Sequence, residues 1–270
     1  MQPISQETFN YLSQNPFKNI VLLKMLQAYP DAITCHRVND IRGHGVLLLL
    51  QTRASSYDSK TYPNTRYVVL MSSSNAWAAT ALAAHIPIDQ PLIFKLNTEH
   101  DHAALASQFQ LQRITSFISF THANDSPPTY KHNDAIQISP TLDINCLPLF
   151  AQQGYDEADM EHYFGHNNAY CIAYYQQNQP IAACFTYQNY SAIWEIGGVY
   201  TLPTARKQGY GRQVVAAALK HLQQNHLKPR YQAHEQNTAS IQLALSLHLQ
   251  PALSTTHWLL NSAMPLSKNK

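Results

Sequence analysis

The alternation of apolar and polar positions divides the chain into two similar halves. In the first half, apolar residues recur at helical spacing up to position 29 and then in short runs typical of strands. Helices are predicted near 75–85 and 99–109, and strands near 32–38, 45–52, 66–71, 91–96 and 112–121. Three strands are thus followed by two alternations of helix and strand.

The same order is predicted again after residue 135. The expected helices lie near 156–164, 208–225 and 238–249, and the expected strands near 169–175, 181–187, 191–201, 230–234 and 254–260. This order of strands and helices parallels that of the first half. The repetition predicts that this unit is present twice.

The boundary between the halves is predicted from turn chemistry. Residues 122–134 include Asn-Asp-Ser-Pro-Pro and show no periodicity, which is typical of a connecting segment. We therefore place a first domain at 1–122, a linker at 123–135 and a second domain at 136–270.

Glycine is scarce, and its positions point to one segment. The chain has eight glycines in 270 residues, and four of them fall within 195–213: Gly197, Gly198, Gly209 and Gly211. The last two precede an amphipathic helix. A helix start presents unpaired N–H groups and the positive end of the dipole, so small residues there form a cradle for an anion. The alternative is that these glycines serve only helix packing.

The pattern in this segment is not one of the common nucleotide motifs, because Gly-x-Gly-x-x-Gly and Gly-Lys-Ser/Thr are both absent. Instead, Arg206-x-x-Gly209-x-Gly211 follows Gly-Gly-Val-Tyr-Thr-x-Pro. This resembles the coenzyme A pyrophosphate loop of the GCN5-related N-acetyltransferase (GNAT) superfamily. The resemblance covers about residues 140–262, through the strand at 230–234 and Asn237-x-x-Ser240 at the last helix. It implies an α/β (α+β) fold of the GNAT type, with a mixed central sheet flanked by helices, in two GNAT-like halves. The first half lacks the motif and is not expected to bind coenzyme A.

The resemblance also implies a binding site for acetyl-CoA as co-substrate. The residues implied to hold its diphosphate are Arg206, Lys207, Gln208, Gly209, Tyr210, Gly211 and Arg212. In the family, the preceding strand splays from its neighbour and binds the pantetheine arm and the thioester through backbone groups, here those of Val199, Tyr200 and Thr201. Glycines just before them would tolerate a bulge. Asn237, with Ser240, resembles the residues that meet the arm, and Asn237 is also suited to cap the last helix.

Glu195 is the predicted general base, because it lies fourteen residues before Gly209, where the histone-acetylating branch carries a glutamate. Two alternatives are that ordered waters take the amine proton and that Glu195 hydrogen-bonds the substrate. The general acid is not identified. The family carries a tyrosine seven residues after the Asn, and this chain has Ala244 there. Candidates to replace it are Tyr200, Tyr231 and His234.

Composition narrows the partners and the compartment. A net charge of +2 gives no reason to expect binding to nucleic acid or to an anionic membrane. Apolar runs are far shorter than the roughly 20 residues that span a bilayer, and the first ten residues do not resemble a secretory signal. Four dispersed cysteines indicate reduced thiols in a cytoplasmic protein. No spacing of His or Cys favours a metal, and a homodimer is left open.

The resulting hypothesis is an N-acetyltransferase that moves acetyl directly to a primary amine of a small molecule or peptide. The acceptor is expected between the halves, near Tyr174, Tyr187 and Tyr190. One alternative is a non-catalytic acyl-CoA-binding or regulatory module, which Ala244 favours. Another is an acyltransferase with a longer acyl or an aminoacyl donor, as in peptidoglycan-bridging enzymes with tandem GNAT-like halves. The sequence does not identify the acceptor.

Overall fold

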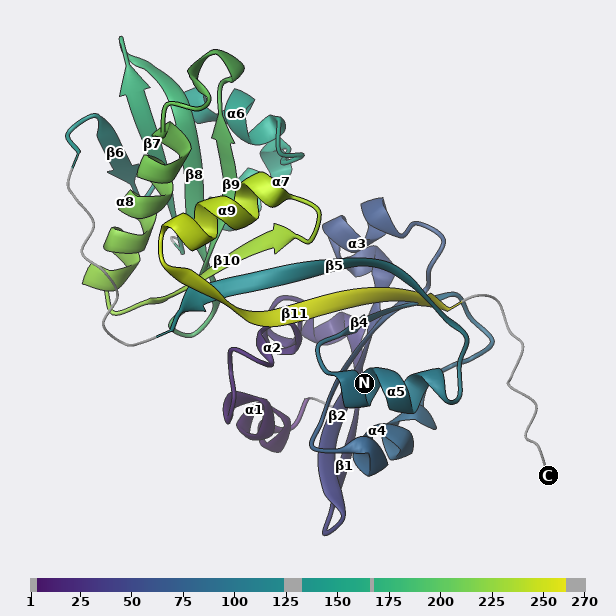
Figure 1. Ribbon diagram of the computed structural model, residues 1–270. Coiled ribbons are helices and arrows are strands. Elements are labelled where there is room, and N and C mark those ends of the chain that lie inside the picture. Colours follow the sequence, from purple (N-terminus) through teal and green to yellow (C-terminus); the bar gives the residue numbers. More distant parts are fainter. Residues whose placement is uncertain (1–3, 124–132, 166–167, 261–270) are drawn as a thin grey trace. The chain divides into compact units, whose positions relative to one another are not determined.

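The computed structural model describes residues 4–123, 133–165 and 168–260 (Figure 1). The chain forms two compact units: one runs up to Phe117 and resumes at Leu253, and the other is Ile118–Ala252. Most of the predicted linker, 124–132, lies outside the described residues. The predicted second domain, 136–270, differs from the observed unit because the final strand pairs with a strand of the first unit.

The first unit contains a sheet with strand order β1-β2-β3-β4-β11-β5. Pairing is antiparallel from β1 to β3, parallel between β3 and β4, and antiparallel between β4 and β11. The strands are β1 (Ile33–Asp40), β2 (Gly43–Gln51), β3 (Tyr67–Ser73), β4 (Leu92–Leu96), β5 (Leu111–His122) and β11 (Leu249–Leu260). The helices are α1 (Gln6–Ser13), α2 (Ile20–Ala28), α3 (Ser56–Thr61), α4 (Ala76–Ala83) and α5 (Glu99–Ala106). Strands β5 and β11 continue into the second unit.

The second unit has the strand order β5-β10-β9-β8-β7-β6. Pairing between β10 and β9 is parallel, and the meander from β9 to β6 is antiparallel. Its further strands are β6 (Ile136–Ser139), β7 (Ala169–Gln176), β8 (Gln179–Tyr190), β9 (Ile193–Thr201) and β10 (Lys228–His234). Its helices are α6 (Leu147–Ala151), α7 (Glu157–Phe164), α8 (Tyr210–Gln224) and α9 (Thr238–Ser246).

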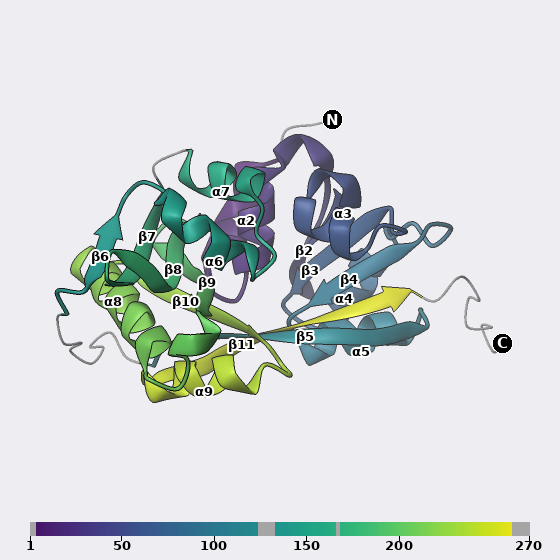
Figure 2. The same cartoon turned by 90° about the horizontal axis from the view of Figure 1, so that it is seen from above.

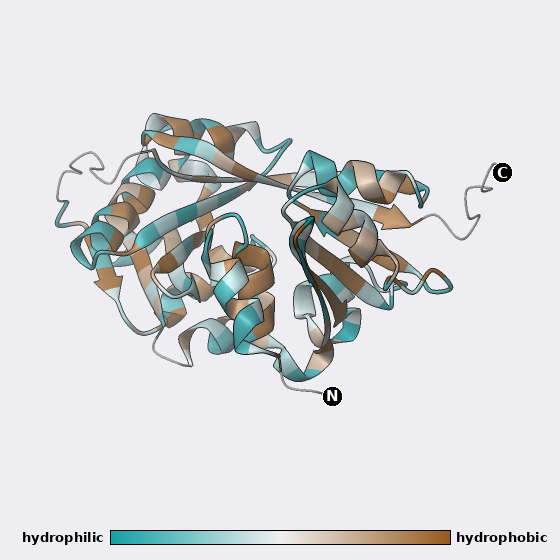
Figure 3. Cartoon of the chain, turned by 90° about the horizontal axis from the view of Figure 1, so that it is seen from below, coloured by the Kyte–Doolittle hydropathy of each residue, from teal (hydrophilic) through white to brown (hydrophobic). Residues whose placement is uncertain are grey.

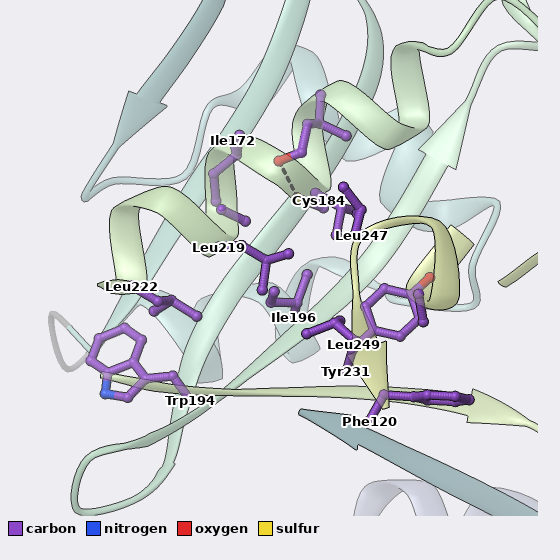
Figure 4. Close-up of a cluster of buried hydrophobic side chains, with 14 of the residues drawn as sticks. Phe120, Ile172, Cys184, Trp194, Ile196, Leu219, Leu222, Tyr231, Leu247 and Leu249 are labelled. Carbon is purple, nitrogen blue, oxygen red and sulfur yellow. Dashed lines mark hydrogen bonds between the residues drawn. The ribbon is translucent and has the colours of Figure 1, made fainter. Parts of the chain in front are cut away.

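Helices cover both faces of the second unit's sheet, with α8 and α9 on one face and α6 and α7 on the other (Figure 2). The apolar face of α8 is fully buried, including Val214 and Leu219, and packs against Ile172 and Ile196 (Figure 4). Apolar stretches, brown in Figure 3, run along the strands, whereas turns are mostly teal. Burial of this face anchors α8, and it therefore fixes where the helix begins.

A buried polar cluster lies in the first unit, far in sequence from the predicted loop. Lys95 Nζ on β4 lies 2.6 Å from Asp58 Oδ1 on α3, and Tyr62 Oη lies 2.6 Å from His257 Nδ1 on β11. Lys95 and His257 are opposite each other in the β4–β11 pairing. Burial, followed by the charge of Lys95, lowers the pKa of His257 to about 3.

We expect this histidine to make the protein less stable in acid. The unfolded chain takes up the proton near the ordinary pKa of 6.5, whereas the folded chain resists it down to about 3. The free energy of unfolding should therefore fall as the pH drops below 6.5, by about 3 kcal/mol between pH 7 and pH 4. Urea unfolding at both pH values, in wild type and His257→Asn, measures this. Equal losses in the two proteins would rule the explanation out.

Candidate functional site

Strand β9 is kinked at its two glycines. Phe185 of β8 lies opposite Gly197, but Ala183 lies opposite Tyr200, so β9 carries one extra residue at this point. Gly198 adopts φ +62°, and a Cβ there would approach the Phe185 ring to 2.5 Å. A side chain is therefore excluded both by the backbone angle and by space. The predicted bulge is confirmed.

Beyond the bulge, β9 and β10 separate. Their parallel pairing joins Ile193–Ile196 to Lys228–Tyr231 and extends no further, although β9 continues to Thr201 and β10 to His234. The stretch of β9 after the glycines, which includes Val199, Tyr200 and Thr201, thus presents an edge that β10 does not fill. Backbone groups on such an edge can bind an extended ligand.

The connection from β9 to α8 ends in an uncapped helix start. A short 3-10 helix, Pro203–Ala205, leads into the loop. Lys207 and Gly209 have φ +61° and +84°, and Gly209 is the N-cap residue without a side-chain hydrogen bond to the helix. The first helical hydrogen bond runs from Gln213 N to Gly209 O at 3.0 Å. The N–H groups of the helix's first three residues therefore have no partner within the helix.

Both glycines of the loop keep this helix start accessible. No atom lies within 4 Å of a Cβ built at Gly209, so the space in front of the amides is open. At Gly211 a Cβ would come within 3.1 Å of Thr201 Oγ1, so the helix start lies close to the end of β9. The uncapped amides and the open edge of β9 are consequently adjacent.

Cationic side chains surround the loop. Arg206 Nε donates to Thr201 O at 3.1 Å, and its guanidinium lies 5.4 Å from the ring centre of Tyr200. Arg212 donates to Ser246 O at 3.3 Å, and Gln208 Nε2 donates to Thr204 O at 3.4 Å. These side chains and that of Lys207 are exposed. Free amides, the helix dipole and nearby positive charges together fit a diphosphate.

The corresponding helix of the first unit begins differently. Only Ser74 and Asn75 separate β3 from α4. The Asn75 side chain accepts a hydrogen bond from Ala78 N at 3.0 Å, so one of the free amides of α4 is already occupied. Because the connection is short and the helix is capped, the first unit has no comparable cradle at this place.

Glu195 and Arg230 form a buried ion pair where β9 and β10 are still joined. They are partners in the parallel pairing, and their side chains are 10% and 4% exposed. Arg230 also donates to Ser119 Oγ and to Asn189 Oδ1, both at 3.1 Å. In a place that water hardly reaches, each of the two charges compensates the other. The sequence did not reveal this pair, although an arginine within a predicted strand was a signal that a charged partner was needed.

Most of the second unit matches a known protein family. Residues 140–248 match the family described as the Acetyltransferase (GNAT) family. The second half of the chain is a GNAT domain. This confirms the resemblance on which the expected site rests, and it covers both the β9–α8 loop and α9. No curated protein matches the chain in sequence.

Solved structures share the fold along most of the chain. A GNAT-family acetyltransferase from Colwellia psychrerythraea is 11% identical, with a TM-score of 0.58 over 96% of this chain and 99% of that one. A Drosophila protein is 13% identical, with a TM-score of 0.63 over 97% and 98%. A tandem GNAT protein from the clavulanic acid biosynthesis pathway is 11% identical, with a TM-score of 0.52 over 91% and 88%. The predicted fold, with two GNAT-like halves, is confirmed.

The residues expected to meet the pantetheine arm, and the candidates for the general acid on this side of the domain, lie on β10 and at α9. Asn237 caps α9 by accepting a hydrogen bond from Ser240 N at 3.0 Å, as expected. Ser240 Oγ lies 2.7 Å from the hydroxyl of Tyr231, which is buried. Ala244 is completely buried in the core against α8. His234 Nδ1 accepts from Gln236 N at 3.1 Å.

Two of the three tyrosines expected near the acceptor, Tyr174 and Tyr187, lie on opposite faces of the sheet. Tyr174 packs on the α8 face of the sheet, with its ring 4.6 Å from that of Tyr210. Tyr187 lies on the opposite face, with its ring 4.3 Å from that of Tyr163 on α7. The sheet separates the two side chains, so they cannot belong to one wall. Alternation along β7 and β8 fixes each face, but the sequence did not reveal which faces match.

The part of the chain that the structure describes contains neither a metal-binding cluster nor a membrane-spanning helix. Residues 4–123, 133–165 and 168–260 contain no cluster of three or more His, Cys, Asp or Glu side chains suited to a metal. Among the described helices, none is both long and apolar enough to cross a bilayer.

Proposed function

We propose that this protein is an acetyl-CoA-dependent N-acetyltransferase that moves the acetyl group directly to a primary amine. The observation that carries the proposal is the adjacency of the uncapped start of α8 to the open edge of β9. This adjacency supports the binding of a diphosphate beside an extended arm, and coenzyme A carries these two groups next to each other.

Each part of the proposed site would bind a different part of acetyl-CoA. The amides at the start of α8, with Arg206, Lys207 and Arg212, hold the diphosphate. Backbone groups of β9 after the bulge hold the arm, which brings the thioester to the glycines. Acetyl-CoA supplies the activated acyl group, and the site contributes mainly by positioning it against the amine. Such positioning accelerates transfer without a covalent enzyme intermediate.

We further propose that Glu195 has a structural role, holding β9 to β10 where their separation begins. The carboxylate is engaged by the guanidinium of Arg230, its partner in the β9–β10 pairing, and both side chains are buried. In this account the amine loses its proton to water. The role of general base stays a prediction, and variants of this pair distinguish the two roles.

The activity is tested by measuring thiol release from acetyl-CoA over a panel of primary amines, including small amines, amino acids and peptides. We expect release that depends on the amine and produces acetylated acceptor in equal amount. Tight binding of coenzyme A without thiol release from any acceptor would instead favour the non-catalytic module, for which the buried Ala244 is the supporting observation. Longer acyl and aminoacyl donors, assayed in parallel, test the remaining alternative.

A further inference from the structure

Tyr155 reaches the β9 bulge from outside the expected site. It lies in the connection between α6 and α7. Its hydroxyl oxygen is 3.3 Å from the position that a Cβ would take at Gly197, and the backbone of Gly198 hydrogen-bonds the same hydroxyl. Both glycines of the bulge therefore meet this one side chain.

The ring of Tyr155 is held in place by aromatic neighbours. Its centre lies 5.1 Å from that of Phe185 in an edge-to-face arrangement, and 6.2 Å from that of Tyr163. Phe185 is fully buried and is the same ring that excludes a side chain at Gly198. Aromatic contacts of this kind fix ring orientation. The hydroxyl is consequently placed over the bulge before any ligand binds.

The hydroxyl of Tyr155 retains one hydrogen to donate. The Gly198 contact lowers the pKa of the phenol, so the backbone N–H is the donor and the phenol oxygen the acceptor. Receiving one hydrogen bond polarises a hydroxyl and strengthens the bond that it donates.

Burial, the neighbouring Tyr163 and the charge of Glu195 raise the pKa of Tyr155 above its ordinary value of 10.0. This outweighs the lowering by the Gly198 backbone. The phenol therefore keeps its proton at neutral pH and is able to act as a hydrogen-bond donor throughout the range in which an enzyme of this kind works.

We propose that the Tyr155 hydroxyl donates a hydrogen bond to the carbonyl oxygen of the acyl group at the β9 bulge. This inference rests on the proposed function. When the amine nitrogen bonds to the carbonyl carbon, the carbonyl π electrons move to the oxygen, and Tyr155 stabilises the resulting negative charge. When the carbonyl re-forms, the C–S bond breaks and its electrons leave with the thiolate. The tyrosine keeps its proton in both steps.

The first test is Tyr155→Phe, which removes the hydroxyl and retains the ring. We expect kcat to fall about 100-fold, the usual order for loss of one donor to an oxyanion, while the KM for acetyl-CoA and the Kd for coenzyme A stay at the wild-type values. The matched control is Tyr163→Phe, which removes a hydroxyl from the same aromatic cluster and is expected to keep kcat within about threefold of wild type.

A second test keeps the hydroxyl and changes only its acidity, in case Tyr155→Phe does not fold. With 3,5-difluorotyrosine at position 155, the phenol ionises at lower pH and then has no hydrogen to donate. The fluorinated protein should therefore lose kcat at an alkaline pH at which wild type, whose phenol is still protonated, keeps it. If Tyr155 served only packing, fluorination would not change the pH dependence of kcat.

The outcomes separate this inference from the proposed function. Thiol release by wild type together with an unchanged kcat in Tyr155→Phe, or an unchanged alkaline limb in the fluorinated protein, overturns the role of Tyr155 and leaves the function standing. A changed KM with an unchanged kcat also overturns it, since that result indicates ground-state binding. Absence of thiol release by wild type overturns both.

Discussion

Replacing Glu195 with Gln is expected to lower the free energy of unfolding by about 3 to 5 kcal/mol, because it leaves the charge of Arg230 buried without a counter-charge. The side chains of this pair are 10% and 4% exposed, so water cannot replace the lost carboxylate. Urea unfolding of the variant at neutral pH measures the loss. The control is Glu161→Gln on α7, an exposed carboxylate, for which a change within about 0.5 kcal/mol is expected.

A double variant sharpens this prediction. Removing both charges together, as Glu195→Leu with Arg230→Met, should recover most of the lost stability, because apolar residues of similar volume replace a buried ion pair at little cost. The kinetic outcome distinguishes the roles of Glu195. A general base would lose kcat in Glu195→Gln while the protein remained as stable as wild type, and that result would contradict the structural role.

The second large effect is expected at the helix start. Gly209→Val should weaken coenzyme A binding by about 100-fold or more, because a branched side chain would occupy the open space in front of the α8 amides. Losing two hydrogen bonds to a charged group costs about 3 kcal/mol or more. Calorimetric titration of the variant with coenzyme A measures the change in Kd.

Gly154→Val is a closely matched control for this variant. Gly154 also has φ +84°, and a Cβ there would likewise meet no atom within 4 Å. The backbone strain caused by a side chain is therefore similar at both positions, but Gly154 is not part of the loop before α8. We expect its variant to bind coenzyme A as wild type does. Equal losses in the two variants would show that backbone strain, and not the cradle, explains the effect.

Local patterns predicted much of the fold. The helix expected at 208–225 is observed at Tyr210–Gln224, and the strands expected near 169–175 and 181–187 are observed as β7 and β8. Two short helices were missed. The six residues of α3 lie between the strands expected near 45–52 and 66–71 and begin at the Ser55 cap. The five residues of α6 are too few to establish a period. The pairing of β11 with β4 joins distant segments and left no local signal.

In the candidate site, too, the features made by contiguous residues were predictable, and the contacts between distant residues were not. The loop before α8 was predictable because a helix start, its glycines and its cations are contiguous in sequence. The bulge was predictable for the same reason, from Gly197 and Gly198. The partner of Glu195 depends on the register between β9 and β10, and the place of Tyr155 depends on how the α6–α7 connection packs against β9. Neither contact produces a periodic pattern of residues in the sequence.

The central claim is that the start of α8 binds the diphosphate of coenzyme A. Its most direct test is calorimetric titration of the full chain with coenzyme A and, separately, with pantetheine, which carries the same arm without the diphosphate. The account predicts saturable binding of one coenzyme A per chain and much weaker binding of pantetheine. No heat with coenzyme A, or equal affinity for the two compounds, would contradict it.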